Sequence, residues 1–189
     1  YYSLLKDIVS FLTHPHNEPD ISKSTKFKVY DTIGLYILKL FFLIPVLLFF
    51  AFVYDPVNVQ SASMAERFSP LVLLLVGGII LPLVEEIAFR LSLVYRSVYV
   101  SLSSTALTYY VLTKAVYGTK VSAVDETFLV RVSLSILFGL LLFAVLNIKS
   151  INNTLHAFWH THFRYILYTL CVVFAWIHIS KYELNALNI

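Results

Sequence analysis

The chain has few charged residues and almost no cysteine. Only 13% of its 189 residues are Asp, Glu, Lys or Arg, compared with about 25% in a soluble domain, and 59% are hydrophobic. This composition excludes an ordinary soluble domain and predicts an integral membrane protein. The single cysteine, Cys171, excludes an intramolecular disulfide, and its position in an apolar segment predicts a packing role rather than redox chemistry.

Motifs of several common protein classes are also absent. The formal net charge is only +3, and no basic run contains interleaved aromatic residues, so we expect no nucleic-acid partner. The sequence has no phosphate-binding loop and no His-Glu-x-x-His zinc motif. The small excess of positive charge instead indicates membrane lipids as the expected partners of the protein.

Long apolar runs predict an all-α, polytopic bundle with about five transmembrane helices. Each run approaches the roughly 20 residues that a helix needs to cross a bilayer. The third run is semipolar because it contains several serines and threonines, and the fifth is short. The runs are residues 33–54, 70–95, 102–117, 129–148 and 165–179.

The segments between these runs complete the predicted organisation. We expect residues 1–32 to form an amino-terminal interfacial segment and residues 33–189 to form one transmembrane domain, with residues 149–164 as a connection. Lysine and arginine are slightly more frequent on the amino-terminal side of the membrane, which favours a cytoplasmic amino terminus. Within the second run, Gly77-Gly78 predicts a close helix approach, and Pro82 predicts a bend.

Three charged residues interrupt the second apolar run and form the first candidate site. An ionised side chain at such a depth costs roughly 2.5 to 3.5 kcal/mol, so Glu85, Glu86 and Arg90 indicate a functional site by default. On a helix, Glu86 and Arg90 share a face and are predicted to pair, which leaves Glu85 to activate a water molecule. The alternative is a buried Glu–Arg pair that only fixes helix register.

The last apolar run ends in a second candidate, Phe174-Ala-Trp-Ile-His178. A neutral imidazole at this position can hold or relay a proton, although a single histidine at a helix end is also typical of an ordinary interfacial residue. The residues by themselves leave both readings open.

Together, these two motifs resemble the CPBP family of intramembrane proteases, which includes the CAAX prenyl endopeptidase and bacterial abortive-infection and bacteriocin-processing proteins. Glu85, Glu86 and Arg90 match the family motif Glu-Glu-x-x-x-Arg, and Phe174 and His178 match Phe-x-x-x-His. The resemblance implies an intramembrane endopeptidase in which Glu85 activates water together with His178, while Glu86 and Arg90 shape the site.

The resemblance also implies partners, location and one missing element. A peptide or lipidated peptide is the expected substrate, as in CAAX-box protein processing, and the bacterial cytoplasmic membrane is the expected location. The family's third motif, a histidine with an asparagine four residues later, has no match, so we expect the chain to end before it. A divalent metal remains open as a cofactor, since a glutamate with a histidine can also activate water without an ion.

Two look-alike patterns and two rival functions complete the interpretation. Phe143 to Asn147 copies the spacing of the second motif but is interpreted as packing. His156, His160 and His162 have spacing seen in zinc sites, but no acidic or sulfur ligand adjoins them. A non-catalytic scaffold or immunity protein is the main alternative to the protease, and a proton-coupled carrier is another.

Overall fold

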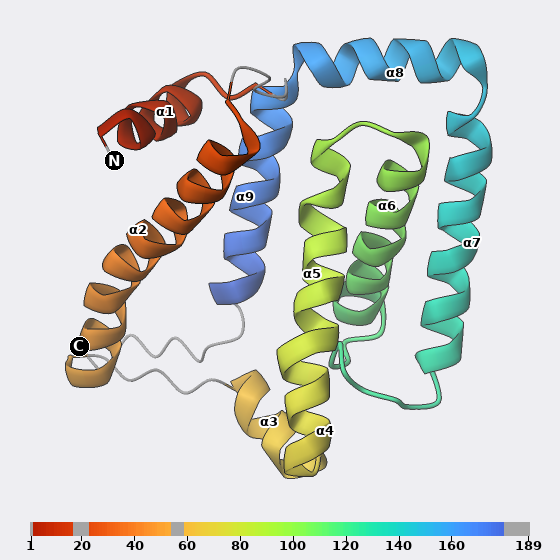
Figure 1. Ribbon diagram of the computed structural model, residues 1–189. Coiled ribbons are helices and arrows are strands. Elements are labelled where there is room, and N and C mark those ends of the chain that lie inside the picture. Colours follow the sequence, from red (N-terminus) through yellow and green to blue (C-terminus); the bar gives the residue numbers. More distant parts are fainter. Residues whose placement is uncertain (1, 17–22, 54–58, 180–189) are drawn as a thin grey trace. The chain divides into compact units, whose positions relative to one another are not determined.

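The computed structural model of the protein describes residues 2–16, 23–53 and 59–179. All regular structure in these residues is helical and none is strand, which confirms the predicted all-α class (Figure 1). The chain divides into two compact units. Unit 1 comprises residues 1–60 and 176–189, and unit 2 comprises residues 61–175.

Unit 1 contains a short amphipathic helix and a long apolar one. Helix α1 spans Tyr2–Thr13 and α2 spans Thr25–Phe52, so the long helix starts earlier than the predicted first span. Lys23, just before α2, donates hydrogen bonds to Asp7 of α1 at 2.6 Å and to Asp31 of α2 at 2.8 Å. These two bonds raise the pKa of Lys23 above its usual range and join the two helices.

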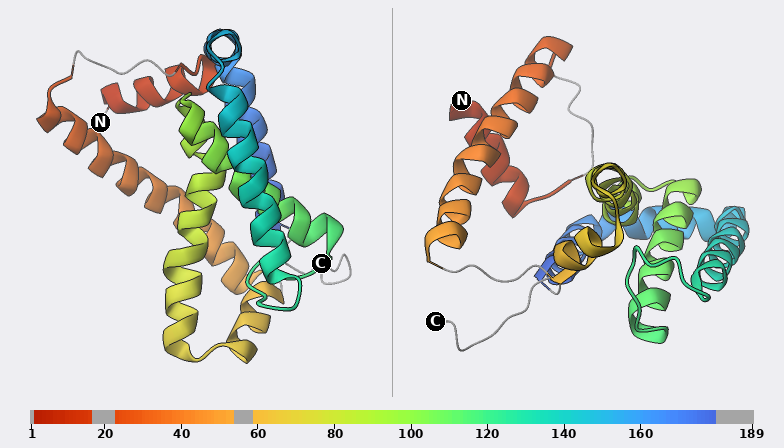
Figure 2. Two further views of the ribbon diagram at one scale, coloured as in Figure 1. Left: turned by 90° about the vertical axis from the view of Figure 1, so that its right-hand side faces the viewer. Right: turned by 90° about the horizontal axis from the view of Figure 1, so that it is seen from below.

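Unit 2 is built around three helical stretches that lie side by side, as Figures 1 and 2 show. The first is formed by α4, η1, α5 and η2, the second by α6 and η3, and the third by α7. The bounds of the elements that reach into this unit are α3 (Val59–Arg67), α4 (Pro70–Leu75), η1 (Val76–Ile80), α5 (Leu81–Phe89), η2 (Leu91–Leu93), α6 (Ser97–Val111), η3 (Leu112–Val116), α7 (Phe128–Leu146), α8 (Lys149–Thr161) and α9 (Phe163–Ile179).

Fewer helices qualify as membrane spans than the sequence predicts. Among the described residues, three helices are long and apolar enough to cross a membrane: Thr25–Phe52, Pro70–Leu93 and Phe128–Leu146. A fourth is possible if α8 and α9, which meet at an angle of 78°, count as one broken span. The expectation of about five spans is therefore not confirmed. Its weakest member was the semipolar run that folds as α6 and η3.

The second span contains a π-helical turn just before the charged residues. Pro82 has no N–H to donate to the carbonyl of Gly78, and the turn preceding it widens so that the Leu81 N–H donates to the Val76 carbonyl. The bend predicted at Pro82 stays a prediction; the feature observed here is the π turn over Val76–Ile80. Turns of this kind are frequent at functional sites.

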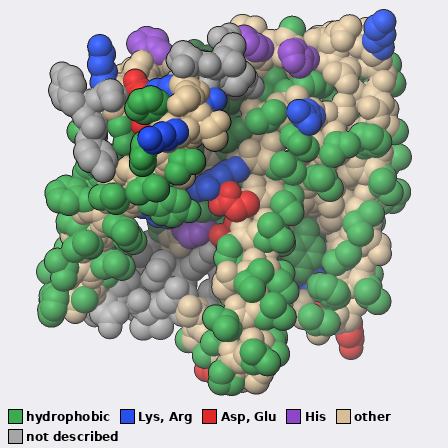
Figure 3. Space-filling model, in the orientation of Figure 1, with side chains coloured by type: hydrophobic (Ala, Val, Ile, Leu, Met, Phe, Trp, Pro, Cys, Tyr) green, Lys and Arg blue, Asp and Glu red, His purple; other side chains and the backbone are tan. Residues whose placement is uncertain are grey.

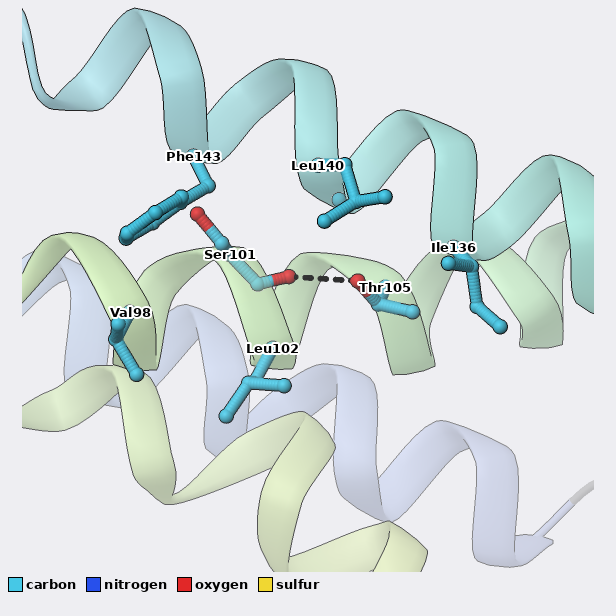
Figure 4. A pocket seen from close by; sticks show the side chains of 8 residues that line it. Val98, Ser101, Leu102, Thr105, Ile136, Leu140 and Phe143 are labelled. Carbon is cyan, nitrogen blue, oxygen red and sulfur yellow. Dashed lines mark hydrogen bonds between the residues drawn. The ribbon is translucent and has the colours of Figure 1, made fainter.

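The closest helix approach lies between α6 and α7 rather than at Gly77-Gly78. A Cβ on Gly139 of α7 would lie 1.8 Å from the Thr105 hydroxyl oxygen of α6, whereas one on Gly77 would meet only the terminal methyl of Met64, at 3.5 Å. The Thr105 hydroxyl is held in place because it donates to the Ser101 carbonyl at 2.9 Å (Figure 4). Only glycine therefore fits at position 139.

A small hollow of about 240 Å³ adjoins this crossing. Figure 4 shows Ser101, Leu102 and Thr105 of α6 facing Leu140 and Phe143 of α7 across it. Phe143, the first residue of the look-alike Phe-x-x-x-Asn pattern, is one of its lining residues, and Asn147 lies exposed at the carboxyl end of α7. Phe143 therefore has the packing role that the sequence interpretation gave it.

A fully buried arginine closes the other end of the α6–α7 pair. The guanidinium of Arg131 donates five hydrogen bonds of 3.0 to 3.2 Å, so that all of its N–H groups are satisfied. Its acceptors are the side chains of Tyr109, Thr113, Asp125 and Thr127 and the carbonyl of Ala123. Arg131 thereby fastens the loop between α6 and α7 onto both helices.

We predict that Gly139→Ala destabilises the protein by about 1 to 3 kcal/mol, because the added methyl displaces Thr105 in a packed crossing. Gly77→Ala is the matched control and is expected to be neutral or slightly stabilising, since alanine is the better helix former. Thermal unfolding in detergent measures both variants. The double variant G139A/T105A should recover most of the loss; an additive double variant would contradict the proposed contact.

The Asp125 carboxylate makes stability depend on pH in a defined direction. Hydrogen bonds from Thr127 and Thr119, together with the bond from Arg131, hold the pKa of Asp125 well below its ordinary value of 3.8. A group whose pKa is lower in the folded state adds stability above its ordinary pKa, and this contribution disappears as the pH falls toward the folded value. The relevant window therefore lies below pH 3.8.

We predict that Asp125→Asn lowers the unfolding temperature at neutral pH, and that its difference from the wild type shrinks as the pH falls below 3.8. Glu126→Gln is the matched control, because this exposed neighbour makes none of these hydrogen bonds. A difference between wild type and D125N that stays constant across the acid range would show that the Asp125 bonds do not stabilise the folded state.

Candidate functional site

Glu86 and Arg90 form an ion pair along one face of α5. The Arg90 Nη1 atom lies 2.9 Å from Glu86 Oε1, and the two side chains are 68% and 51% exposed. Figure 3 shows acidic and basic side chains side by side over α5 with hydrophobic side chains around them. The predicted pairing is confirmed. Because both partners lie on α5, the pair bridges one turn of that helix and does not connect two helices.

Glu85 occupies a different face of the same helix. It is half-buried, and it lies close enough to Tyr110 of α6 for its carboxylate charge to influence the Tyr110 hydroxyl. Adjacent residues on a helix point about 100° apart, which separates this carboxylate from the Glu86–Arg90 pair. The two glutamates therefore have different surroundings, one beside a guanidinium and the other toward a buried phenol.

The carboxyl end of α5 is held by its neighbour α6. Helix α5 ends at Phe89, so the carbonyl of Ala88 has no partner within the helix. The Ser103 hydroxyl of α6 donates to this carbonyl at 2.6 Å, and both Ser103 and Ala88 are buried. The bond fixes the helix turn that carries Glu85, Glu86 and Arg90.

Helix α8 holds the short turn that follows the charged cluster. Residues 149–164, which the sequence suggested to be a connection, contain a helix because Ile151, Leu155, Phe158 and Trp159 repeat with helical spacing. The indole N–H of Trp159 donates to the Ser92 carbonyl at 2.9 Å, and the ring of Tyr95 packs against Trp159.

A second group of bonds joins the start of α8 to the start of α6. The Asn152 amide donates to the Ser97 hydroxyl at 2.8 Å and to the Leu146 carbonyl at 2.9 Å. The Tyr95 hydroxyl in turn donates to the Asn152 carbonyl at 3.4 Å, and burial raises the pKa of this phenol. The polypeptide that follows the charged cluster is therefore anchored to α8.

The phenylalanine of the second motif packs directly beside the first motif. The rings of Phe174 on α9 and Phe89 on α5 meet edge to face, with centroids 5.3 Å apart, and Phe89 is buried. His178 lies one turn further along the continuous helix α9, is half-buried and belongs to unit 1. The structure thus brings together Glu86 and Arg90, and Phe89 and Phe174, within unit 2.

His156 and His162 pack against aromatic rings. The His156 ring packs edge to face with Tyr95, and the His162 ring stacks on Phe158 at 4.4 Å. Within residues 2–16, 23–53 and 59–179, no group of three or more His, Cys, Asp and Glu side chains is arranged to hold a metal ion.

Two residues of this site were not predicted from the sequence. Ser103 and Tyr110 are seven positions apart on α6, so both lie on the face that meets α5. The polar character of residues 102–117 was noted, but it was not resolved into faces. Polar residues that recur at helical spacing within that run are the signal that identifies Ser103 and Tyr110.

Comparison of the chain with protein-family models, with curated proteins and with solved structures found no significant match.

We predict that Ser103→Ala costs about 1 kcal/mol of stability, because it leaves the buried Ala88 carbonyl without a donor. It should also speed amide hydrogen exchange at Arg90 and Ser92, where α5 passes into η2. Ser133→Ala, which removes an exposed hydroxyl from α7, is the control and should change neither quantity. Unchanged exchange at the end of α5 in S103A would refute the anchoring role of Ser103.

Proposed function

We propose that the protein is an integral membrane endopeptidase of the CPBP type, which hydrolyses a peptide bond with glutamate-activated water. One observation carries the proposal. Glu86 is neutralised by Arg90 on one face of α5, while Glu85 occupies a separate, half-buried face near Tyr110. Two adjacent carboxylates in different environments are what a site needs if one carboxylate is to act as a base and the other is to be structural.

In the proposed reaction, the Glu85 carboxylate takes a proton from a water molecule as its oxygen attacks the scissile carbonyl carbon. The C–N bond of the tetrahedral intermediate then breaks, and the leaving amine receives a proton from the glutamic acid. We assign His178 to the same proton path on the basis of the motif resemblance. Glu86 and Arg90 hold the shape of the α5 turn and do not exchange protons.

The proposal includes a membrane topology. We retain about five spans, with α6 and η3 crossing as one helix in which Ser103 bonds to α5 and Thr113 to α7, and with α9 as the last span. The slight excess of basic residues supports a cytoplasmic amino terminus, and the family resemblance supports the bacterial cytoplasmic membrane. A peptide or lipidated peptide presented at the membrane is the proposed substrate.

The main alternative is a non-catalytic scaffold or immunity protein in which the charged cluster only locks helices together. Such a lock needs charges that bridge separate helices. In unit 2 the Glu86–Arg90 pair lies within α5, and α5 and α6 are held together by Ser103 and by close packing instead. The Glu86–Arg90 pair is therefore not itself a lock between helices.

We predict that Glu85→Gln in the complete gene product lowers cleavage of a membrane-tethered peptide by about 100-fold or more, because glutamine cannot accept the proton of the attacking water. Its unfolding temperature should stay close to that of the wild type. Glu66→Gln, an exposed glutamate on α3, is the control and should cleave at the wild-type rate. Undiminished cleavage by E85Q would exclude this mechanism. If the wild type shows no measurable cleavage and E85Q fails to fold, the results would favour the scaffold.

A further inference from the structure

A long apolar groove runs along the face of the second span that is turned away from the charged cluster. Its walls come from α4, η1 and α5 on one side and from α6, α7 and the loop between them on the other, and it encloses about 660 Å³. Val84 and Ile87 of α5 line it, whereas Glu85 and Glu86 between them do not. The groove is therefore separate from the proposed catalytic residues.

We propose that this groove binds an acyl chain of an anionic glycerophospholipid. The inference is independent of the proposed protease activity. The volume of the groove lies within the usual range of ligand sites, which is about 300 to 1,000 Å³. Val72 and Ile87 both line the groove, and ~22 Å of helix rise separates them. The groove is therefore longer than the ~15 Å depth of one leaflet. One acyl chain can extend along the groove.

The polar side chains that line the groove are already satisfied within the protein. The Thr105 hydroxyl donates to the Ser101 carbonyl, that of Ser135 to the Arg131 carbonyl, and that of Tyr109 to the Val121 carbonyl, at 2.7 to 2.9 Å. They offer little to a polar ligand, and apart from Ser122, whose hydroxyl accepts from Arg67, the remaining lining side chains are hydrocarbon or aromatic. The occupant that fits such a wall is a hydrocarbon chain.

One end of the groove carries two positive charges. Phe68 lines the groove, and Arg67 immediately precedes it. The Nη2 atom of Arg67 donates to the hydroxyl of Ser122, another lining residue, at 3.0 Å. Lys120 donates to the hydroxyl of Ser63, and the Nε atom of Arg67 donates to the carbonyl of that same serine. Ser63 thus brings the ammonium and the guanidinium together at the mouth of the groove.

These two cations have no acidic partner among the residues that the structure describes. Of the acids in their own elements, Glu66 and Glu126 form no ion pair within the described residues, and Asp125 pairs with Arg131. Two exposed like charges held together favour an anionic ligand, and Arg–phosphate contacts are strong charge-assisted bonds. A basic pair at the end of an apolar groove matches a lipid phosphate with its acyl chain attached.

The test uses the full chain in neutral detergent with two photoreactive lipids that carry the same diazirine-labelled acyl chain. One is phosphatidylglycerol and the other is phosphatidylcholine, so that they differ only in headgroup charge. After illumination, labelled peptides are identified by mass spectrometry. We expect phosphatidylglycerol adducts on peptides of residues 70–87 and 102–109, and weaker labelling by phosphatidylcholine. Equal labelling by both lipids, or adducts elsewhere, would overturn the proposal.

Three variants and one competitor make the test specific. R67Q/K120Q should lower phosphatidylglycerol labelling about tenfold, since each basic residue adds to anionic-lipid affinity, and should leave phosphatidylcholine labelling unchanged. R96Q/K149Q removes two exposed charges elsewhere and should have no effect. Ala106→Phe fills the groove and should reduce labelling by both lipids. Competition by inorganic phosphate alone would indicate a simple anion site and refute acyl-chain binding.

A photo-crosslinking residue at position 106 tests the other possible occupants. Capture of lipid is the expected result and would agree with the labelling pattern. Crosslinks to α2 of the same chain would show that the groove is filled by the protein itself, and a crosslinked dimer would show that a second copy covers it. Either of these results would overturn the lipid proposal.

Discussion

The packing of the semipolar helix α6 between α5 and α7 is the interaction on which the rest of unit 2 depends. A membrane core offers no water to polar groups, so each hydroxyl must find a partner inside the protein. Ser103 donates to a carbonyl at the end of α5, and Thr113 accepts from the buried guanidinium of Arg131 on α7. Thr105 bonds within α6, at the point where Gly139 allows α7 to approach. Through Ser103 and Thr113, one helix therefore bonds to both of its neighbours, while the buried hydroxyl of Ser101 makes no hydrogen bond within the described part of the chain.

This packing determines how the charged cluster is presented. The bond from Ser103 closes the end of α5, and Trp159 of α8 holds the turn that follows it. The Glu86–Arg90 pair and Glu85 lie on different faces of the helix turn that leads into these anchors. Catalytic groups need this kind of support, because small displacements of a positioned base cost large factors in rate.

Two sides of the second span have different surroundings, one apolar and one charged. Val84 and Ile87 face the apolar groove, and the two glutamates face away from it. A lipid held along one face would stabilise the packing of α5 against α6 and α7 without entering the charged cluster. The π turn at Val76–Ile80 lies in the same span and widens it where the groove wall passes.

Sequence alone determined the helical class, the main apolar spans and the pairing of Glu86 with Arg90, because hydrophobic run length and i, i+4 spacing are local properties. The tertiary structure decided which glycine permits close approach, why α6 is semipolar, that residues 149–161 are helical against the Ser92–Ser97 turn, and that Arg131 is buried. These features depend on contacts between residues far apart in the chain. Spacing along one helix cannot specify which face will meet a partner, since that is settled only when the helices pack.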